Sequence, residues 1–231
     1  MIHGVAMIIA FSGVDCAGKS TQIELLRQYF ISQGKTCAVF WYRPGYSAEI
    51  QRLKDLVRPL FSRGRSGGRD APSEGAPSAS GGVAAPPQAR VPAPVWLVTA
   101  ILDAVGQYAV KLRILAKRYD VVICDRYVHD ACLDLAFKFP GFAWSDAVLQ
   151  AISVLFPKPD ISLLLWLPYD EMMARVEAKN EPFPDAPRIR RMRWRAYDLL
   201  AEREGITVMD VTGDIETNRK AILRAVLNVQ A

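Results

Sequence analysis

The chain has 231 residues, 51% of them hydrophobic, so it is long and apolar enough to bury the core of one folded domain. Its 29 Lys and Arg residues exceed its 24 Asp and Glu residues, and the resulting net charge of +5 leaves nucleic acid, acidic lipid and nucleotide phosphates open as partners. Four cysteines without close pairing and only two histidines exclude a cysteine-rich or histidine-rich metal site.

Strand-like and helix-like segments alternate along the chain. Short apolar runs bounded by turns predict strands at 7–11, 36–42, 120–124, 161–167 and 206–210. Apolar side chains at helical spacing predict helices at 20–33, 47–61, 95–119, 128–138, 145–155, 169–178, 188–204 and 215–226. Parallel strands need crossover connections, so this order predicts an α/β fold in which a five-stranded parallel sheet carries helices on both faces. We expect one domain over residues 1–231.

Residues 62–94 interrupt this alternation. Gly, Ala, Ser and Pro account for 24 of these 33 residues, and few large apolar side chains remain to offset the entropy cost of ordering the segment. We expect a disordered insertion there.

The helix expected at 95–119 is apolar but contains Asp103 and Gln107. Its uninterrupted apolar run is too short to span a bilayer, which favours a core helix. The N-terminal run has no preceding Lys or Arg and no small-residue cleavage site, which disfavours a secretory signal. We therefore expect a cytoplasmic protein without a membrane partner.

The most informative motif is GVDCAGKS, which fits the pattern G-x-x-x-x-G-K-[ST] between an expected strand and an expected helix. Its two glycines allow backbone N–H groups to surround phosphate oxygens, and the following helix directs its positive end at the same anion. Lys19 would reach the terminal phosphates, and the Ser20 hydroxyl would coordinate Mg²⁺. We expect nucleotide binding by Gly13, Val14, Asp15, Cys16, Ala17, Gly18, Lys19, Ser20 and Thr21.

Charged residues after the strand at 120–124 and in an arginine-rich segment complete the expected site. Asp125 follows the apolar strand at 120–124, at the sheet edge where open α/β sheets bind ligands, so we assign it with Ser20 to Mg²⁺. Arg126 follows directly and adds a positive charge at that edge. Five arginines gather at 188–195, where one or two of them, Arg188 first, could neutralise a phosphoryl group during transfer.

The runs IAFSGVDCAGKSTQIELL, DVVICDRYVHD and FPKPDISLLLWL, followed by a segment ending in RAYDLLAE, occur in this order. In order and spacing they resemble the thymidylate kinases and related nucleoside monophosphate kinases. The resemblance implies a P-loop kinase fold that uses ATP and Mg²⁺, a lid at about 178–187 and transfer of the γ-phosphoryl group to a nucleoside monophosphate, dTMP first. It also makes a homodimer plausible.

By the same resemblance, Asp15 faces the acceptor and Arg126 contacts the acceptor phosphate. Together with the motifs above, this gives an expected catalytic set of Lys19, Arg126, Asp15 and Arg188 and an expected substrate-binding set of Asp15, Arg43, Asp103, Arg126 and Tyr127. The acceptor half departs from the family pattern: Arg43 directly precedes Pro44, the segment TAILDA carries no arginine, and Asp130 replaces a frequent serine.

Three other functions remain open. The altered acceptor segments could serve a P-loop kinase that acts on a different small metabolite. The chain could instead be a regulatory protein that binds ATP and has lost transfer activity. Nucleic-acid binding is suggested by the charge and by the arginine-rich helix expected at 188–204. The chain elsewhere has no basic stretch interleaved with aromatic residues, so we expect small nucleotides as partners and no nucleic acid.

Overall fold

The computed structural model describes residues 6–44, 93–142, 145–179, 186–203 and 205–229. The helix expected at 47–61, residues 62–92 of the expected insertion and residues 180–185 of the expected lid lie outside the described residues. The last two residues assigned to the insertion, Ala93 and Pro94, begin a helix instead. Proline is compatible with a first helical turn, because N–H groups there lack helical partners anyway.

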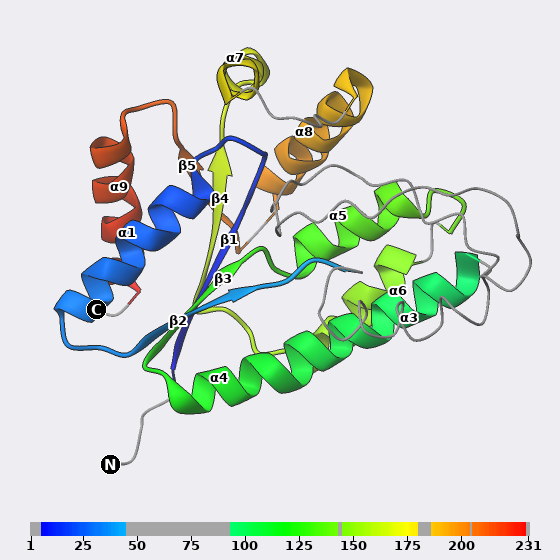
Figure 1. Ribbon diagram of the computed structural model, residues 1–231, viewed down its shortest axis with the longest axis horizontal. Coiled ribbons are helices and arrows are strands. Elements are labelled where there is room, and N and C mark those ends of the chain that lie inside the picture. Colours follow the sequence, from blue (N-terminus) through cyan, green and yellow to red (C-terminus); the bar gives the residue numbers. More distant parts are fainter. Residues whose placement is uncertain (1–5, 45–92, 143–144, 180–185, 204, 230–231) are drawn as a thin grey trace, which may run out of the picture.

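Five strands form one sheet of order β2-β3-β1-β4-β5 (Figure 1). Every pair of neighbouring strands is parallel, as predicted. The strands are β1 (Met7–Gly13), β2 (Cys37–Trp41), β3 (Val121–Asp125), β4 (Ile161–Trp166) and β5 (Thr207–Asp210).

The helices agree with the sequence prediction to within a few residues wherever both can be compared. They are α1 (Lys19–Ser32), α3 (Ala93–Val105), α4 (Leu112–Arg118), α5 (Val128–Lys138), α6 (Ser145–Ile152), α7 (Tyr169–Lys179), α8 (Pro187–Ala201) and α9 (Ile215–Asn228). The single long helix predicted at 95–119 is continuous but contains a π-helical segment, Gly106–Lys111, between α3 and α4. A short 3₁₀ turn, Ser153–Leu155, follows α6.

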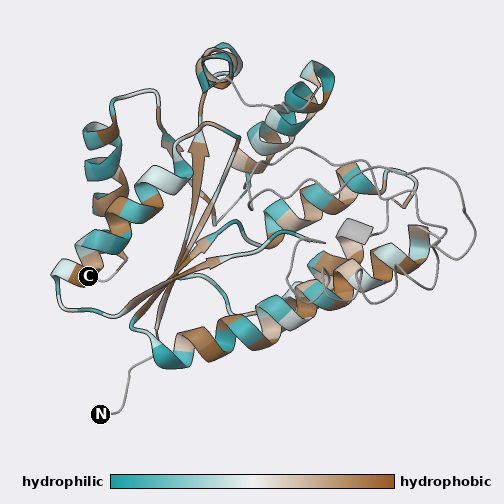
Figure 2. Cartoon of the chain, viewed as in Figure 1, coloured by the Kyte–Doolittle hydropathy of each residue, from teal (hydrophilic) through white to brown (hydrophobic). Residues whose placement is uncertain are grey.

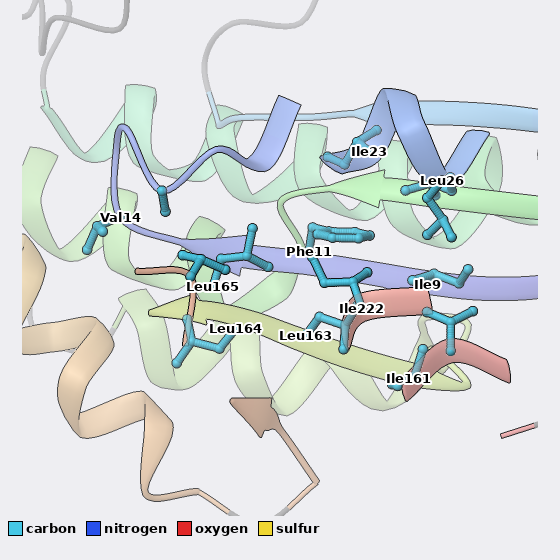
Figure 3. Close-up of a cluster of buried hydrophobic side chains, with 14 of the residues drawn as sticks. Ile9, Phe11, Val14, Ile23, Leu26, Ile161, Leu163, Leu164, Leu165 and Ile222 are labelled. Carbon is cyan, nitrogen blue, oxygen red and sulfur yellow. The ribbon is translucent and has the colours of Figure 1, made fainter. Parts of the chain in front are cut away.

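Helices cover both faces of the sheet, because successive side chains on a strand point to opposite faces. On one face, side chains of β1 and β4 pack with α1 and α9, and Figure 3 shows Ile9, Phe11, Ile161, Leu163, Ile23, Leu26 and Ile222 gathered there. On the other face, Ile8, Ala10, Val122 and Cys124 pack with Leu97, Tyr108 and Leu135. Figure 2 shows strongly hydrophobic strands between helices that carry mixed polar and apolar residues.

One helical stretch in the described part of the chain, Ala93–Arg118, is long and apolar enough by length and composition to cross a membrane. Its side chains at Leu97, Ala104 and Tyr108 are fully buried against the sheet, whereas Leu102 and Val110 are exposed. One such helix is weak evidence for a membrane span, since a core helix passes the same test.

The site is positioned by the carboxyl edge of the sheet. The strands β1 and β3 lie next to each other with Phe11 opposite Asp125, so the segments that follow both strands leave the sheet side by side. Helices α7 and α8 lie beyond the carboxyl end of β4 (Figure 1). Polar and charged residues from distant parts of the sequence therefore lie close together at the carboxyl edge of the sheet.

Candidate active site

The loop between β1 and α1 requires glycine at two positions. Gly13 has φ 139°, and a Cβ placed on it would lie 2.4 Å from the carbonyl oxygen of Leu165 on β4. Gly18, which precedes α1, has φ 80°. Cys16 also lies in the left-handed region, with φ 62°. Helix α1 begins directly after this loop, so the positive end of its dipole faces the loop, an arrangement suited to phosphate.

Lys19 is buried beneath the loop. Its ammonium group donates hydrogen bonds to the carbonyl oxygens of Gly13 at 2.8 Å and Val14 at 2.6 Å. Burial, together with the positive charge of Arg126, lowers the pKa of Lys19 to about 8. Both hydrogen-bond partners found among the described residues are neutral, so a phosphate group at the loop would strongly favour the protonated lysine.

Asp125 and Ser20 are the residues expected to hold Mg²⁺. Asp125 ends β3 and is partly buried, and burial raises the pKa of its carboxyl group while Lys19 and Arg126 oppose the shift. No hydrogen bond to this carboxylate comes from the described residues, and Ser20 is exposed in the first turn of α1. A carboxylate and a hydroxyl fit Mg²⁺, which takes few protein ligands and completes its shell with water and phosphate oxygens. The described residues contain no cluster of three or more His, Cys, Asp or Glu side chains suited to a metal.

Arg126 occupies the centre of the charged groups. Its backbone has φ 77°, a strained conformation for a non-glycine residue, and its N–H group donates to the carbonyl oxygen of Phe11 at 2.9 Å. Its Nη2 lies 3.1 Å from Oδ1 of Asp15, and its Nη1 donates to the Tyr197 hydroxyl at 3.3 Å. Burial lowers the pKa of Arg126, but Tyr197, Asp130 and Asp15 outweigh burial and raise it above its usual value.

Asp15 connects this arginine to the loop. Burial raises its pKa, yet the nearby charges of Lys19 and Arg126 outweigh that effect and lower the pKa below its usual value. The side chain is 45% exposed, so the carboxylate stays open to a ligand while it remains ionised.

A second charged cluster lies beside the first. Arg43, two residues after β2, makes a bidentate ion pair with Asp134 of α5 through Nε at 2.6 Å and Nη2 at 3.0 Å. Arg193 of α8 donates to the same carboxylate at 2.8 Å. Burial raises the pKa of Asp134, but the two arginines outweigh burial and lower it. All three side chains are almost completely buried.

The remaining predicted site residues are Asp103, Tyr127 and Arg188. Asp103 of α3 is close enough to Tyr42 to add to the effect of burial in raising the pKa of that tyrosine. Tyr127 turns away, because its hydroxyl donates to the carbonyl oxygen of Pro157 and its ring packs 5.0 Å from the ring of Tyr108. Arg188 is exposed in the first turn of α8, and the buried arginine of that helix is Arg193.

Comparison with curated proteins gives consistent matches. No protein-family model matches the chain. A thymidylate kinase of Bifidobacterium longum strain DJO10A is 29% identical over 148 residues, which cover 64% of this chain and 59% of that protein. Thymidylate kinases of Campylobacter lari and Helicobacter hepaticus are 47% and 45% identical over 51 residues, which cover 22% of this chain and 24% of each relative.

Over these matched segments the chain is similar to thymidylate kinases. The parallel five-stranded sheet described above is consistent with a P-loop nucleoside monophosphate kinase fold. The matched part of the chain spans 59% of the length of this Bifidobacterium longum relative.

Sequence reasoning missed the buried contacts of Arg193, Tyr197 and Asp134. Two carboxylates four residues apart on a helix, such as Asp130 and Asp134, can cap the helix, face solvent or face a ligand. Asp130 accepts a hydrogen bond from the backbone N–H of Tyr127. Both carboxylates are buried, so neither faces solvent. The available signal was their spacing of four residues, matched by the same spacing between Arg193 and Tyr197.

Proposed function

We propose that this chain transfers the γ-phosphoryl group of ATP to a nucleoside monophosphate, dTMP being the first acceptor to test. The observation that carries the proposal is the position of Arg126. Its guanidinium group contacts Asp15 of the phosphate loop at 3.1 Å and Tyr197 of α8 at 3.3 Å. A fixed positive charge between the loop and the acceptor side is what transfer between two phosphates requires.

In this proposal the loop and Lys19 hold the donor. Lys19 would exchange its two carbonyl partners for oxygens of the terminal phosphates and neutralise charge that develops during transfer. Ser20 and Asp125 would hold Mg²⁺, which when bound would neutralise charge on the β- and γ-phosphates. Phosphoryl transfer depends mainly on positioning and charge neutralisation, so the scarcity of histidine and of reactive cysteine is no obstacle.

On the acceptor side, Arg126 and Arg43 would contact the acceptor phosphate, with Asp15 and Asp103 facing the rest of the acceptor. The ionised Asp15 holds one side of the Arg126 guanidinium. Its partial exposure leaves it able to accept a hydrogen bond from a hydroxyl of the acceptor.

An acceptor screen tests the proposal. Purified protein is incubated with Mg²⁺, γ-labelled ATP and, separately, dTMP, dUMP, AMP, CMP, GMP or UMP, and labelled diphosphates are counted. We expect dTDP from wild-type protein and at least about a 100-fold loss of rate in Lys19→Met, whose side chain fills similar space without a charge. Absence of a labelled diphosphate with every monophosphate would refute the proposal.

A kinase for another small metabolite is the second candidate, and the Asp134 cluster favours it. A buried carboxylate held by Arg43 and Arg193 alters the charge available to an acceptor beside Arg126. Labelled product from a metabolite pool but from no monophosphate would establish this alternative. Nucleotide binding that Lys19→Ala abolishes, without any labelled product, would instead indicate a binding protein that lacks transfer activity.

A further inference from the structure

Helix α5 carries two buried carboxylates one turn apart, and helix α8 faces each of them with one polar side chain. Tyr197 donates a hydrogen bond to Oδ1 of Asp130 at 2.6 Å. Arg193 donates to Oδ1 of Asp134 at 2.8 Å. The two α8 residues are also one turn apart, so the helices are joined at two successive points of contact.

Each of these carboxylates also lies next to an arginine of the candidate site. Arg43 forms its bidentate pair with Asp134, and Nη1 of Arg126 lies 3.6 Å from Oδ1 of Asp130. The Tyr197 hydroxyl contacts both groups, since it donates to Asp130 and accepts from Nη1 of Arg126. Arg126 and Arg43 are thus both connected to α8 through α5.

Burial limits how these hydrogen bonds and ion pairs can be replaced. Asp130, Asp134, Arg193 and Tyr197 are each at most 4% exposed. A buried carboxylate that loses a donor has no water to replace it, so either the group stays unpaired at high cost or a neighbour moves to it. The site arginines next to these carboxylates are Arg126, beside Asp130, and Arg43, beside Asp134.

We propose that Tyr197 and Arg193 are positioning residues that, through Asp130 and Asp134, hold Arg126 and Arg43 where they bind the acceptor phosphate. This rests on the proposed function, which assigns that phosphate to the two arginines. Neither Tyr197 nor Arg193 needs to touch the acceptor. The placement of α8 therefore sets the geometry of the acceptor phosphate site.

Tyr197→Phe is the sharpest test, because it removes one oxygen and keeps the buried ring. Without that hydroxyl, Nη1 of Arg126 loses its acceptor and Oδ1 of Asp130 loses its donor. The 3.6 Å gap between these atoms can then close, which would draw the guanidinium group toward α5 and away from Asp15.

We expect kcat/KM for the acceptor to fall about 10- to 100-fold in Tyr197→Phe, the range for loss of one hydrogen bond to a charged group. KM for ATP should change by less than about 2-fold, since the contacts of Lys19 are untouched. A purely structural role would lower the melting temperature and leave both kinetic constants of the folded protein unchanged.

Tyr108→Phe is the matched control. Tyr108 is fully buried, and its hydroxyl has no hydrogen-bond partner among the described residues. The same chemical change there should leave acceptor kinetics at the wild-type value. If Tyr108→Phe lowers kcat/KM as much as Tyr197→Phe does, the proposal is wrong.

Arg193→Met tests the second connection and also serves if Tyr197→Phe does not fold. Asp134 would keep its bidentate pair with Arg43, so no carboxylate is left without a partner. Arg43 would then be held more completely by Asp134 and be less available to phosphate. We expect KM for the acceptor to rise about 3- to 10-fold, and an unchanged KM overturns this half of the proposal.

Side-chain ¹⁵N NMR of Arg126, assigned by comparison with Arg126→Lys, separates this inference from the proposed function because it needs no turnover. We expect the guanidinium signals to shift or broaden in Tyr197→Phe and to stay unchanged in Tyr108→Phe. If wild-type protein phosphorylates no acceptor, the proposed function fails, and the NMR result alone decides whether Tyr197 positions Arg126. Unchanged Arg126 signals in Tyr197→Phe overturn the inference in either case.

Discussion

The donor and acceptor halves of the candidate site are built in different ways. The donor half is mainly one continuous segment, Gly13 to Ser20, whose geometry follows from two glycines and the start of α1. The acceptor half combines β2, α3, α5 and α8, and its central ion pairs join residues 91 and 59 positions apart in sequence. Local backbone conformation therefore determines the donor half, whereas packing of distant elements determines the acceptor half.

Gly13→Ala should have the largest effect on stability and should act on the donor half. The added Cβ would lie 2.4 Å from the carbonyl oxygen of Leu165, and φ 139° is unfavourable for alanine. We expect a loss of more than about 4 kcal/mol in the free energy of unfolding, measured by urea denaturation. Gly18→Ala is the control, because φ is 80° but no atom lies within 4 Å of the new Cβ. It should cost only about 1–2 kcal/mol, and equal losses in the two variants would contradict this explanation.

Asp134→Asn should be the most damaging change in the acceptor half. It would leave the guanidinium groups of Arg43 and Arg193 buried beside a neutral amide. We expect a loss of about 3–5 kcal/mol in the free energy of unfolding, the usual range when one partner of a buried ion pair is removed. Glu24→Gln breaks an exposed pair with Arg27 and should change stability little. A small effect at Asp134 would show that the acceptor cluster is not rigidly buried.

Lys19 should give the donor half a characteristic pH dependence. Its pKa falls from 10.5 to about 8 on folding, so between these values the unfolded chain binds more protons than the folded protein. Stability should therefore rise with pH across this window, by about 3 kcal/mol, and stay level with respect to this group below pH 8. The check is the difference in unfolding free energy between wild-type protein and Lys19→Met from pH 7 to 10.5. No change in that difference would mean that the ammonium group is not buried as described.

Ser12→Ala should have the smallest effect and should act where the two halves meet. The Ser12 hydroxyl, on β1, donates to Oδ2 of Asp130 on α5 at 2.6 Å. We expect a loss of about 1–2 kcal/mol, since Asp130 keeps Tyr197 and the backbone N–H of Tyr127 as donors. A double-mutant cycle with Gly18→Ala should be additive, because no atom lies within 4 Å of a Cβ added at Gly18, so that change does not reach the hydrogen bond between Ser12 and Asp130. Strong coupling would indicate that the two halves are not independent.

Much of the fold could be predicted from sequence because the strands are apolar runs bounded by turns. The sequence predicted all five strands within a few residues, and it predicted their parallel pairing from the helical segments between them. The interruption of the long helix by Gly106–Lys111 could not be predicted, since the apolar pattern continues through it. The start of α3 at Ala93 was also missed, because Ala93 and Pro94 share the composition of the preceding segment.

The candidate site also contains some residues that could be predicted from the sequence and others that could not. Sequence places Gly13, Gly18, Lys19 and Asp125 at one edge of the sheet, because one motif and one strand end fix their positions. Arg126 was identifiable from its place directly after Asp125. Arg193 was hidden among five arginines of similar spacing, and only its burial against Asp134 distinguishes it from the exposed Arg188.

The sequence by itself determined the glycine-containing loop between β1 and α1, the five parallel strands and the sheet edge at which the charged groups lie, because these features depend on residue type and short-range spacing. Only the tertiary structure decided which polar side chains pair. A carboxylate such as Asp134 can cap, face solvent or bind an arginine, and its burial beside Arg43 and Arg193 selects the last by excluding water from it.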